Sequence, residues 1–231
     1  MTTEMDRVIR GGRVVTPDGI IDGDLGIRDG KIAAIGGRIE GAEVIDAGGH
    51  WVMPGGVDVH AHIEQMSGMG VMNADTFETA TRSAAMGGTT SVISFAAQAR
   101  GEPLAQTVAA YQARARRGAM IDYAFHITVT DPAVAGFRDD LAMLIKAGHR
   151  SLKLFTTYNI KLEDDQILAV MAEARAQGAL GCVHAETDAI LSHARESLIA
   201  AGRSRPRDHA ASHPRLAEID AVERMCRFAA Y

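Results

Sequence analysis

The stretch from 55 to 98 holds a strand, a helix and a second strand in immediate succession. Its first part, "GGVDVHAH" (55–62), alternates apolar and polar residues, and its last part, "TTSVISFAAQ" (89–98), is rich in β-branched residues. Between them, "DTFETATRSAAMGG" (75–88) has a helical pattern, with Asp75 as the expected N-cap and Glu78 three residues later. This order predicts a βα unit, in which successive strands run parallel in one sheet.

The same alternation continues toward the C-terminus. Further strands are expected at 121–130, 151–158 and 179–186, and further helices at 103–118, 137–149, 163–178 and 213–231. With the first two strands this makes five, whereas a (β/α)8 barrel needs eight strands and typically about 250 residues. We therefore predict an α/β fold, a (β/α)8 TIM barrel truncated to about five strands, over residues 55–231.

Residues 1–54 have a different rhythm. Short alternating segments such as "DRVIRGGRVV" and "GDLGIRDGKIAAIG" are separated by turns at 17–19 and 29–30. So few strands have little core of their own. We predict a small antiparallel β-unit here, a partial N-terminal β-sandwich that precedes the barrel.

Composition limits the class of protein. The chain has 231 residues and a formal net charge of −5, which argues against nucleic acid or an anionic membrane as partners. It has no run of about 18 apolar residues, and its N-terminus lacks the apolar core of a signal peptide. Cys182 and Cys226 lie far apart and are expected to be buried, reduced thiols. These features predict a cytoplasmic protein.

Two histidines stand one residue apart at the end of the first barrel strand. His60 and His62 would share one face of that strand, and imidazole is a preferred ligand of zinc and similar metals. His-x-His pairs also occur by chance, so the pair alone is weak evidence. His184 ends the fifth strand, and active sites of barrels gather at the carboxyl ends of strands. Together these histidines predict a metal site at that end.

Lys153 lies inside the apolar strand "SLKLFTTY". Its amine either reaches solvent beyond the strand or stays desolvated and partly neutral. A neutral lysine could act as a nucleophile, form a Schiff base or take up CO2 as a carbamate. Tyr158 begins the following loop, where its hydroxyl could donate to a developing oxyanion or serve only as an amphipathic loop aromatic.

Other polar residues near these positions have less specific interpretations. His126 is in the middle of a strand and is expected to pack or hydrogen-bond in the core. Glu186 and Asp188 follow His184 and could either support the site or cap a helix. No Gly-rich dinucleotide motif or P-loop is present in the sequence.

The motifs in this order resemble the N-terminal part of the cyclic amidohydrolases, and the dihydropyrimidinase/hydantoinase group is the most similar. The resemblance runs through all 231 residues and covers the first half of the family's length. The segments that carry it are "EVIDAGGHWVMPGGVDVHAHIEQ", "ADTFETATRSAAMGGTTSVISFAAQ", "DYAFHITVTD", "SLKLFTTY" and "GCVHAE".

This resemblance implies a metal-dependent-hydrolase-type barrel with two divalent metal ions, usually Zn²⁺. In the matching motifs His60 and His62 would bind the more buried ion, N6-carboxylated Lys153 would bridge both ions, and His184 would bind the second. Tyr158 resembles the tyrosine that supports the oxyanion. The implied reaction is hydrolysis of a cyclic amide or imide C–N bond, which opens a dihydropyrimidine or hydantoin ring to an N-carbamoyl amino acid. Full-length relatives are commonly dimers or tetramers.

Several alternatives remain within this resemblance. Dihydroorotase-like enzymes usually have Arg where this chain has Glu64, which argues against them, whereas an allantoinase-like ureide hydrolase stays open. Segment 64–72 departs from the common hydantoinase loop, so the substrate is not specified. The family also needs a histidine after the sixth strand and an aspartate after the eighth, both outside this sequence. We therefore expect no intact active site in the 231 residues alone, and a non-catalytic fragment or interaction protein of the same fold is a further alternative.

Overall fold

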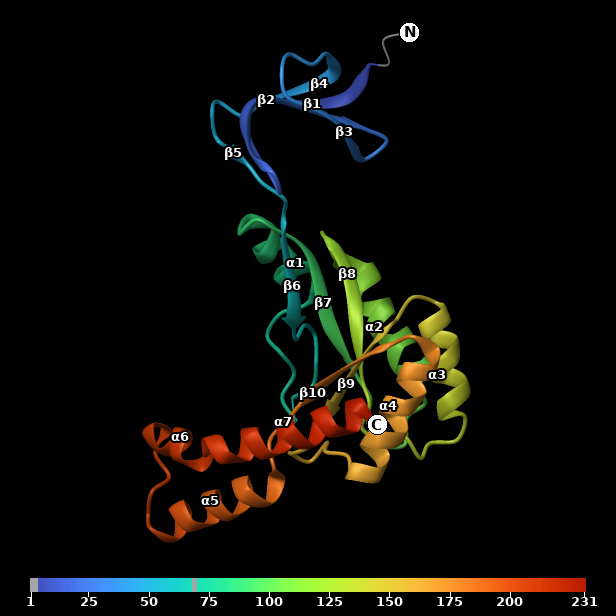
Figure 1. Cartoon of the computed structure of the whole chain (residues 1–231), viewed down its shortest axis with the longest axis vertical. Helices are drawn as coiled ribbons and strands as arrows, with labels where there is room; N and C mark the ends of the chain where they lie inside the picture. Colours follow the sequence, from blue (N-terminus) through green and yellow to red (C-terminus); the bar gives the residue numbers. More distant parts are fainter. Residues whose placement is uncertain (1–3, 68–69) are drawn as a thin grey trace. The chain divides into compact units, whose positions relative to one another are not determined.

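The computed structural model describes residues 4–67 and 70–231. The chain forms two compact units, Met1–Gly56 and Val57–Tyr231, and each is described by itself (Figure 1). Part of segment 64–72, whose sequence left the substrate open, therefore lies outside the described residues. Within the described residues no helix is both long and apolar enough to cross a membrane.

The N-terminal unit is a single mixed sheet. Its strands are β1 (Met5–Thr16), β2 (Gly19–Arg28), β3 (Lys31–Ile35), β4 (Gly41–Asp46) and β5 (Trp51–Val52). The order is β3-β2-β1-β4, with β5 also paired to β1. The two hairpins β1–β2 and β2–β3 are antiparallel, but β4 and β5 run parallel to β1. The prediction of a wholly antiparallel unit was wrong, because alternation along a strand shows its two faces and not its direction relative to a partner.

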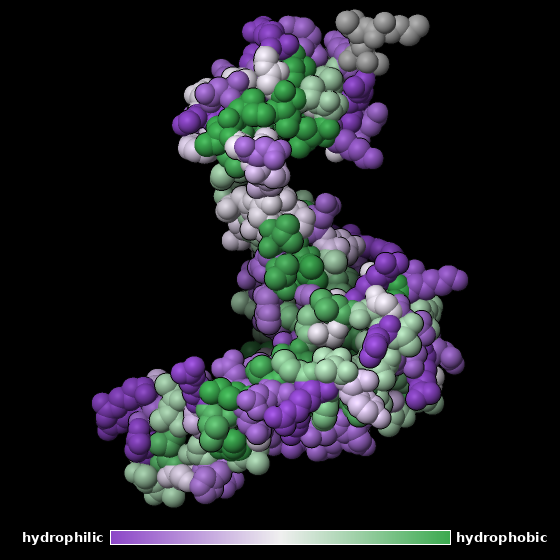
Figure 2. Space-filling view, in the orientation of Figure 1, coloured by the Kyte–Doolittle hydropathy of each residue, from purple (hydrophilic) through white to green (hydrophobic). Residues whose placement is uncertain are grey.

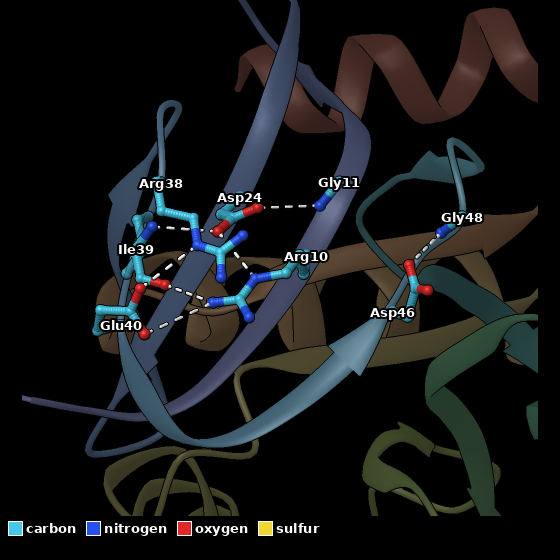
Figure 3. A network of polar contacts seen from close by, with 8 residues as sticks. All are labelled: Arg10, Gly11, Asp24, Arg38, Ile39, Glu40, Asp46 and Gly48. Carbon is cyan, nitrogen blue, oxygen red and sulfur yellow. Dashed lines mark hydrogen bonds and ion pairs between the residues drawn. The ribbon is translucent and has the colours of Figure 1, made fainter.

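A buried carboxylate in the middle of β2 links this strand to β1 and to the segment between β3 and β4 (Figure 3). Asp24 is 4% exposed and accepts hydrogen bonds from the backbone N–H groups of Gly11 (2.9 Å) and Ile39 (3.1 Å). The Arg10 guanidinium lies 3.4 Å from the same carboxylate and also donates to the Ile39 carbonyl at 2.8 Å. These backbone bonds and then Arg10 hold the pKa of Asp24 below its usual value.

The second unit is built around a five-stranded parallel sheet. Its strands are β6 (Gly56–Ala61), β7 (Thr89–Ala97), β8 (Asp122–Thr128), β9 (Ser151–Phe155) and β10 (Leu180–His184). They lie in the order β10-β9-β8-β7-β6, with parallel pairing at β7–β8, β8–β9 and β9–β10. The predicted fold, about five strands of a parallel α/β barrel, is confirmed.

Helices follow the strands, and the first four of them cover one face of this sheet. They are α1 (Phe77–Met86), α2 (Leu104–Gly118), α3 (Phe137–Lys146), α4 (Asp164–Gln177), α5 (Asp188–Ala200), α6 (His209–Ser212) and α7 (Arg215–Ala230). Figure 1 shows α2, α3 and α4 along the same side of the sheet. Fully buried Ile127, Leu152 and Leu154 face this helical layer, so their neighbours in the strands, among them Lys153, face the opposite side.

Both edge strands of the parallel sheet carry exposed apolar residues. Val57 and Val59 on β6 and Leu180 on β10 are each about three-fifths exposed (60%, 58% and 64%). Apolar residues are visible on the surface of each unit in Figure 2. A strand inside a parallel sheet normally has both faces covered and a neighbour on each side. The exposure of these apolar side chains is what an uncovered edge strand shows.

Three local expectations differ from the structure. Helix α1 begins one residue later than expected, with Thr76 as N-cap and Thr79 completing the capping box instead of Asp75 and Glu78. Helix α5 was not predicted from the sequence. Both cysteines are free as expected, but Cys226 is exposed, because its helix turns that side away from the core.

Candidate functional site

The open face of the parallel sheet carries a row of polar and aromatic side chains at the carboxyl ends of the strands. Strand β6 brings His60 and His62 to one side, with ring centroids 5.3 Å apart, as expected for residues two apart on a strand. Phe95 of β7 lies against both, at 4.7 Å from the His60 ring and stacked on the His62 ring at 4.4 Å. The phenyl ring therefore fixes the position of the two imidazoles.

Lys153 on β9 is the buried cation beside this pair. Its side chain is on the open face but the residue is only 8% exposed, with Nζ 5.9 Å from the Phe95 ring centroid and 5.1 Å from that of Phe155. Among the residues that the structure describes, no carboxylate forms an ion pair with this amine. Burial lowers the pKa of Lys153, and the neighbouring Cys182 opposes that shift. A larger fraction of neutral amine follows from this environment.

The charge of Lys153 also acts on the histidine pair. The pKa of His60 lies below its ordinary value because of desolvation first, then because of the positive charges of Lys153 and His62. A neutral imidazole keeps a lone pair available, which is the form that binds a metal ion. The charges and burial at this end of the sheet thus favour a neutral His60 imidazole over a protonated one.

His184 forms a second group at the end of β10. Its ring stacks on Phe155 at 5.6 Å and lies 5.2 Å from the Tyr158 ring, and its Nε2 is 2.6 Å from Oε2 of Glu186. Tyr158 is about half exposed (46%). Burial raises the pKa of the Tyr158 phenol, and the charge of Glu186 and a hydrogen bond to it raise that pKa further. Glu186 does not cap helix α5, whose N-cap is Thr187, and its carboxylate is bonded to His184 instead.

The hydrogen bonds of two histidines leave one ring nitrogen of each for a ligand. Gln65 Oε1 lies 2.9 Å from Nδ1 of His62, which leaves Nε2, while Glu186 takes Nε2 of His184, which leaves Nδ1. A metal-ligating histidine commonly has its second nitrogen held in this way. The donor set therefore fits divalent metals that accept imidazole nitrogen.

The fit is partial within the described residues. No three side chains of the His, Cys, Asp or Glu type gather closely enough there to hold a metal ion. The structure brings His60, His62 and Lys153 together around Phe95, and brings His184 together with Tyr158 around Phe155. These aromatic rings were not predicted as part of the site, although Phe155 is two residues from Lys153 and hence on its face.

His126 belongs to the scaffold of the site. Its Nδ1 is hydrogen-bonded to Ser151 Oγ and its Nε2 lies 2.9 Å from the Val59 carbonyl oxygen. With both nitrogens occupied by protein atoms, this histidine links β6 to β9 across the open face. The expectation of a hydrogen-bonded core residue is confirmed.

Comparison with known proteins places these residues in a family context. A model described as the amidohydrolase family matches residues 51–222. The chain is 42% identical over 223 residues to a D-hydantoinase of Ralstonia pickettii, covering 95% of this chain and 48% of that protein. It superposes on a D-hydantoinase structure with a TM-score of 0.91 at 40% identity, covering 97% of this chain and 49% of the other.

A dihydropyrimidinase structure from Brevibacillus agri is similar to the same extent. Its TM-score is 0.90 at 36% identity, and the match covers 97% of this chain and 49% of that one. The chain thus spans about half the length of the curated relatives it matches.

Proposed function

This chain belongs to the amidohydrolase family, and on that basis we propose that it supplies half of the active site of an enzyme that hydrolyses a cyclic amide or imide. The ring opened would be a hydantoin or dihydropyrimidine, and the product an N-carbamoyl amino acid. The observation that carries the proposal is the pair His60 and His62 beside buried Lys153, at the carboxyl ends of strands similar to those of D-hydantoinases.

The metal centre we propose uses four residues of this chain. His60 and His62 would hold one divalent ion, His184 the other, and carboxylated Lys153 would bridge them. Zinc suits imidazole nitrogen and carbamate oxygen together. When bound, two such ions would activate water for attack and polarise the amide carbonyl.

Lys153 is suited to becoming a carbamate. In its neutral form Nζ adds to CO2, forms the N–C bond and releases one proton, which leaves an anion on a buried side chain. The lowered pKa of Lys153 increases the fraction of the amine that can react at neutral pH. An anion between two cations would also remove the cost of a buried, unpaired ammonium group.

Tyr158 would act on the substrate rather than on the metals. Its ring lies beside His184, and its phenol stays protonated because its pKa is raised. A protonated hydroxyl at this position can donate a hydrogen bond to the oxygen of the carbonyl under attack. A homo-oligomer, dimer or tetramer, and a cytoplasmic location complete the proposal as predictions from the sequence.

The proposal is tested with a complete barrel. Residues 1–231 are fused to the remaining half of the Ralstonia pickettii D-hydantoinase, and hydrolysis of hydantoin, dihydrouracil and allantoin is measured after loading with Zn²⁺. We expect ring opening of hydantoin or dihydrouracil, and a loss of at least about 10³-fold in kcat/KM for His60→Asn, because a metal ligand is removed. Residues 1–231 alone should be inactive.

Two results would overturn it. A folded, metal-loaded fusion that hydrolyses allantoin and neither of the other rings would assign the ureide-hydrolase alternative. A fusion whose turnover survives His60→Asn would show that this half contributes no metal ligand. His193→Asn, on the exposed side of α5, is the matched control and should retain activity.

A further inference from the structure

Tyr158 has a backbone conformation that bulky residues rarely adopt. Its φ is +70°, in the left-handed region, and only Asp29 and Glu64 share a positive φ among the described residues other than glycine. Such a conformation persists only where the surroundings impose it. The contacts of the segment that contains Tyr158 should therefore show what imposes it.

One carboxylate holds two residues of this segment, one on each side of Tyr158. Thr157 Oγ1 donates to Oδ1 of Asp188 at 2.8 Å, and Lys161 Nζ donates to Oδ2 at 2.9 Å. Asp188 is the first residue of α5, so the segment is attached to the start of a helix.

A second side chain holds the far part of the segment. Arg100, from the loop after β7, donates from Nη2 to the carbonyl oxygens of Asn159 (3.2 Å) and Lys161 (3.3 Å). These bonds lie after Tyr158 and involve carbonyl groups only. The Tyr158 carbonyl itself accepts from the Lys161 N–H at 3.2 Å. Asp188 is therefore the contact that holds side chains on both sides of Tyr158.

We propose that Asp188 is a positioning residue that holds segment 157–161 with Tyr158 in the left-handed conformation, and thereby places the Tyr158 side chain beside His184. This inference rests on the proposed function, since it concerns the residue suggested to support the oxyanion. The bond to the Lys161 ammonium, followed by that to Thr157, keeps the pKa of Asp188 low. Asp188 therefore stays charged and able to accept both bonds at neutral pH.

The test compares variants in the zinc-loaded fusion. Tyr158→Phe should lower kcat by about 10²-fold or more, as expected for loss of one oxyanion donor. Asp188→Ala should lower kcat by about 10²-fold, because a displacement of about 1 Å has that effect, with little change in KM. The double variant should be no slower than Tyr158→Phe, because Asp188 acts through that hydroxyl.

A second readout does not depend on turnover. Hydrogen exchange of the Lys161 amide, which donates to the Tyr158 carbonyl, should accelerate in Asp188→Ala, because the segment is no longer attached to α5. Asp220→Asn is the matched control: it changes a carboxylate bonded to Thr187, the N-cap of α5, and should change neither kcat nor this exchange.

The inference is overturned if Tyr158→Phe slows the reaction while Asp188→Ala does not, if the two losses multiply, or if the Lys161 amide is equally protected in the parent and in Asp188→Ala. Failure of the proposed function has a different signature. In that case Tyr158→Phe leaves turnover unchanged, or no cyclic amide is hydrolysed, while amide exchange still decides whether Asp188 holds the segment.

Discussion

Lys153 has an unusual environment for a lysine. A lysine that is 8% exposed, with aromatic rings as neighbours and no ion pair in the described part of the chain, loses hydration without compensation. Such a group is costly for folding, which is a reason to look for a role that neutralises or modifies the amine. The carbamate we propose for Lys153 would also account for the histidines beside it.

Replacing this lysine should separate its folding cost from its function. In the metal-free fusion, Lys153→Met should melt no lower than the parent, since an apolar side chain of similar length replaces a buried cation. Zinc at 100 times its Kd should stabilise the parent by about 2.7 kcal/mol, and Lys153→Met by much less. Thermal melts with and without Zn²⁺ measure both.

Lys146→Met, which changes an exposed lysine at the end of α3, is the control and should respond to zinc like the parent. Equal stabilisation of the parent and Lys153→Met by zinc would remove Lys153 from the metal centre.

At the scale of elements, the N-terminal sheet depends on a charge that its fold buries. Because the pKa of Asp24 is lowered in the folded state, the stability it contributes is fully present above its unfolded value of 3.8 and is lost as the pH falls through the folded value. Asp24→Asn should lower the melting temperature at pH 7, and the difference from the parent should shrink below pH 3.8.

Melting of both proteins at several pH values measures this effect. Asp22→Asn, on the same strand but with a side chain 80% exposed, should show no such dependence. A constant difference between Asp24→Asn and the parent down to pH 2 would contradict the assigned role of the charge.

The order of strands and helices from 55 to 178 was predictable because apolar residues recur with a strand or helix spacing in each element, and turn or capping residues mark the ends. The true N-cap of α1 was not, since Asp75 and Thr76 are both capping residues and the burial of Phe77 decides between them. Helix α5 was missed although Ile190, Leu191, Ala194 and Leu198 recur at helical spacing, and only Leu191 of its residues is buried. Its first residue, Asp188, is bonded to Thr157 and Lys161.

The site was predictable where it depends on one strand. The shared face of His60 and His62 follows from their spacing, and the burial of Lys153 from the apolar residues around it. The bond between His184 and Glu186 and the bonds of Asp188 to Thr157 and Lys161 depend on loop geometry. No periodic pattern encodes that geometry, so these residues had two interpretations until the structure was known.

At the scale of the whole molecule, the second unit is a parallel sheet with helices on one face and donor residues on the other. A closed barrel would surround those residues, whereas here both edge strands are exposed. The relatives are about twice as long as this chain, and the activity we propose belongs to an assembly that includes the corresponding second half. The central claim, however, concerns residues that this chain contains.

That claim is tested most directly by a crystal structure of the zinc-loaded fusion with anomalous diffraction at the zinc edge. We predict two zinc peaks, one contacted by His60 and His62 and the other by His184, with electron density for a carboxyl group beyond Nζ of Lys153 between them. Zinc bound away from these side chains, or an unmodified Lys153 amine beside fully occupied zinc sites, would contradict the account.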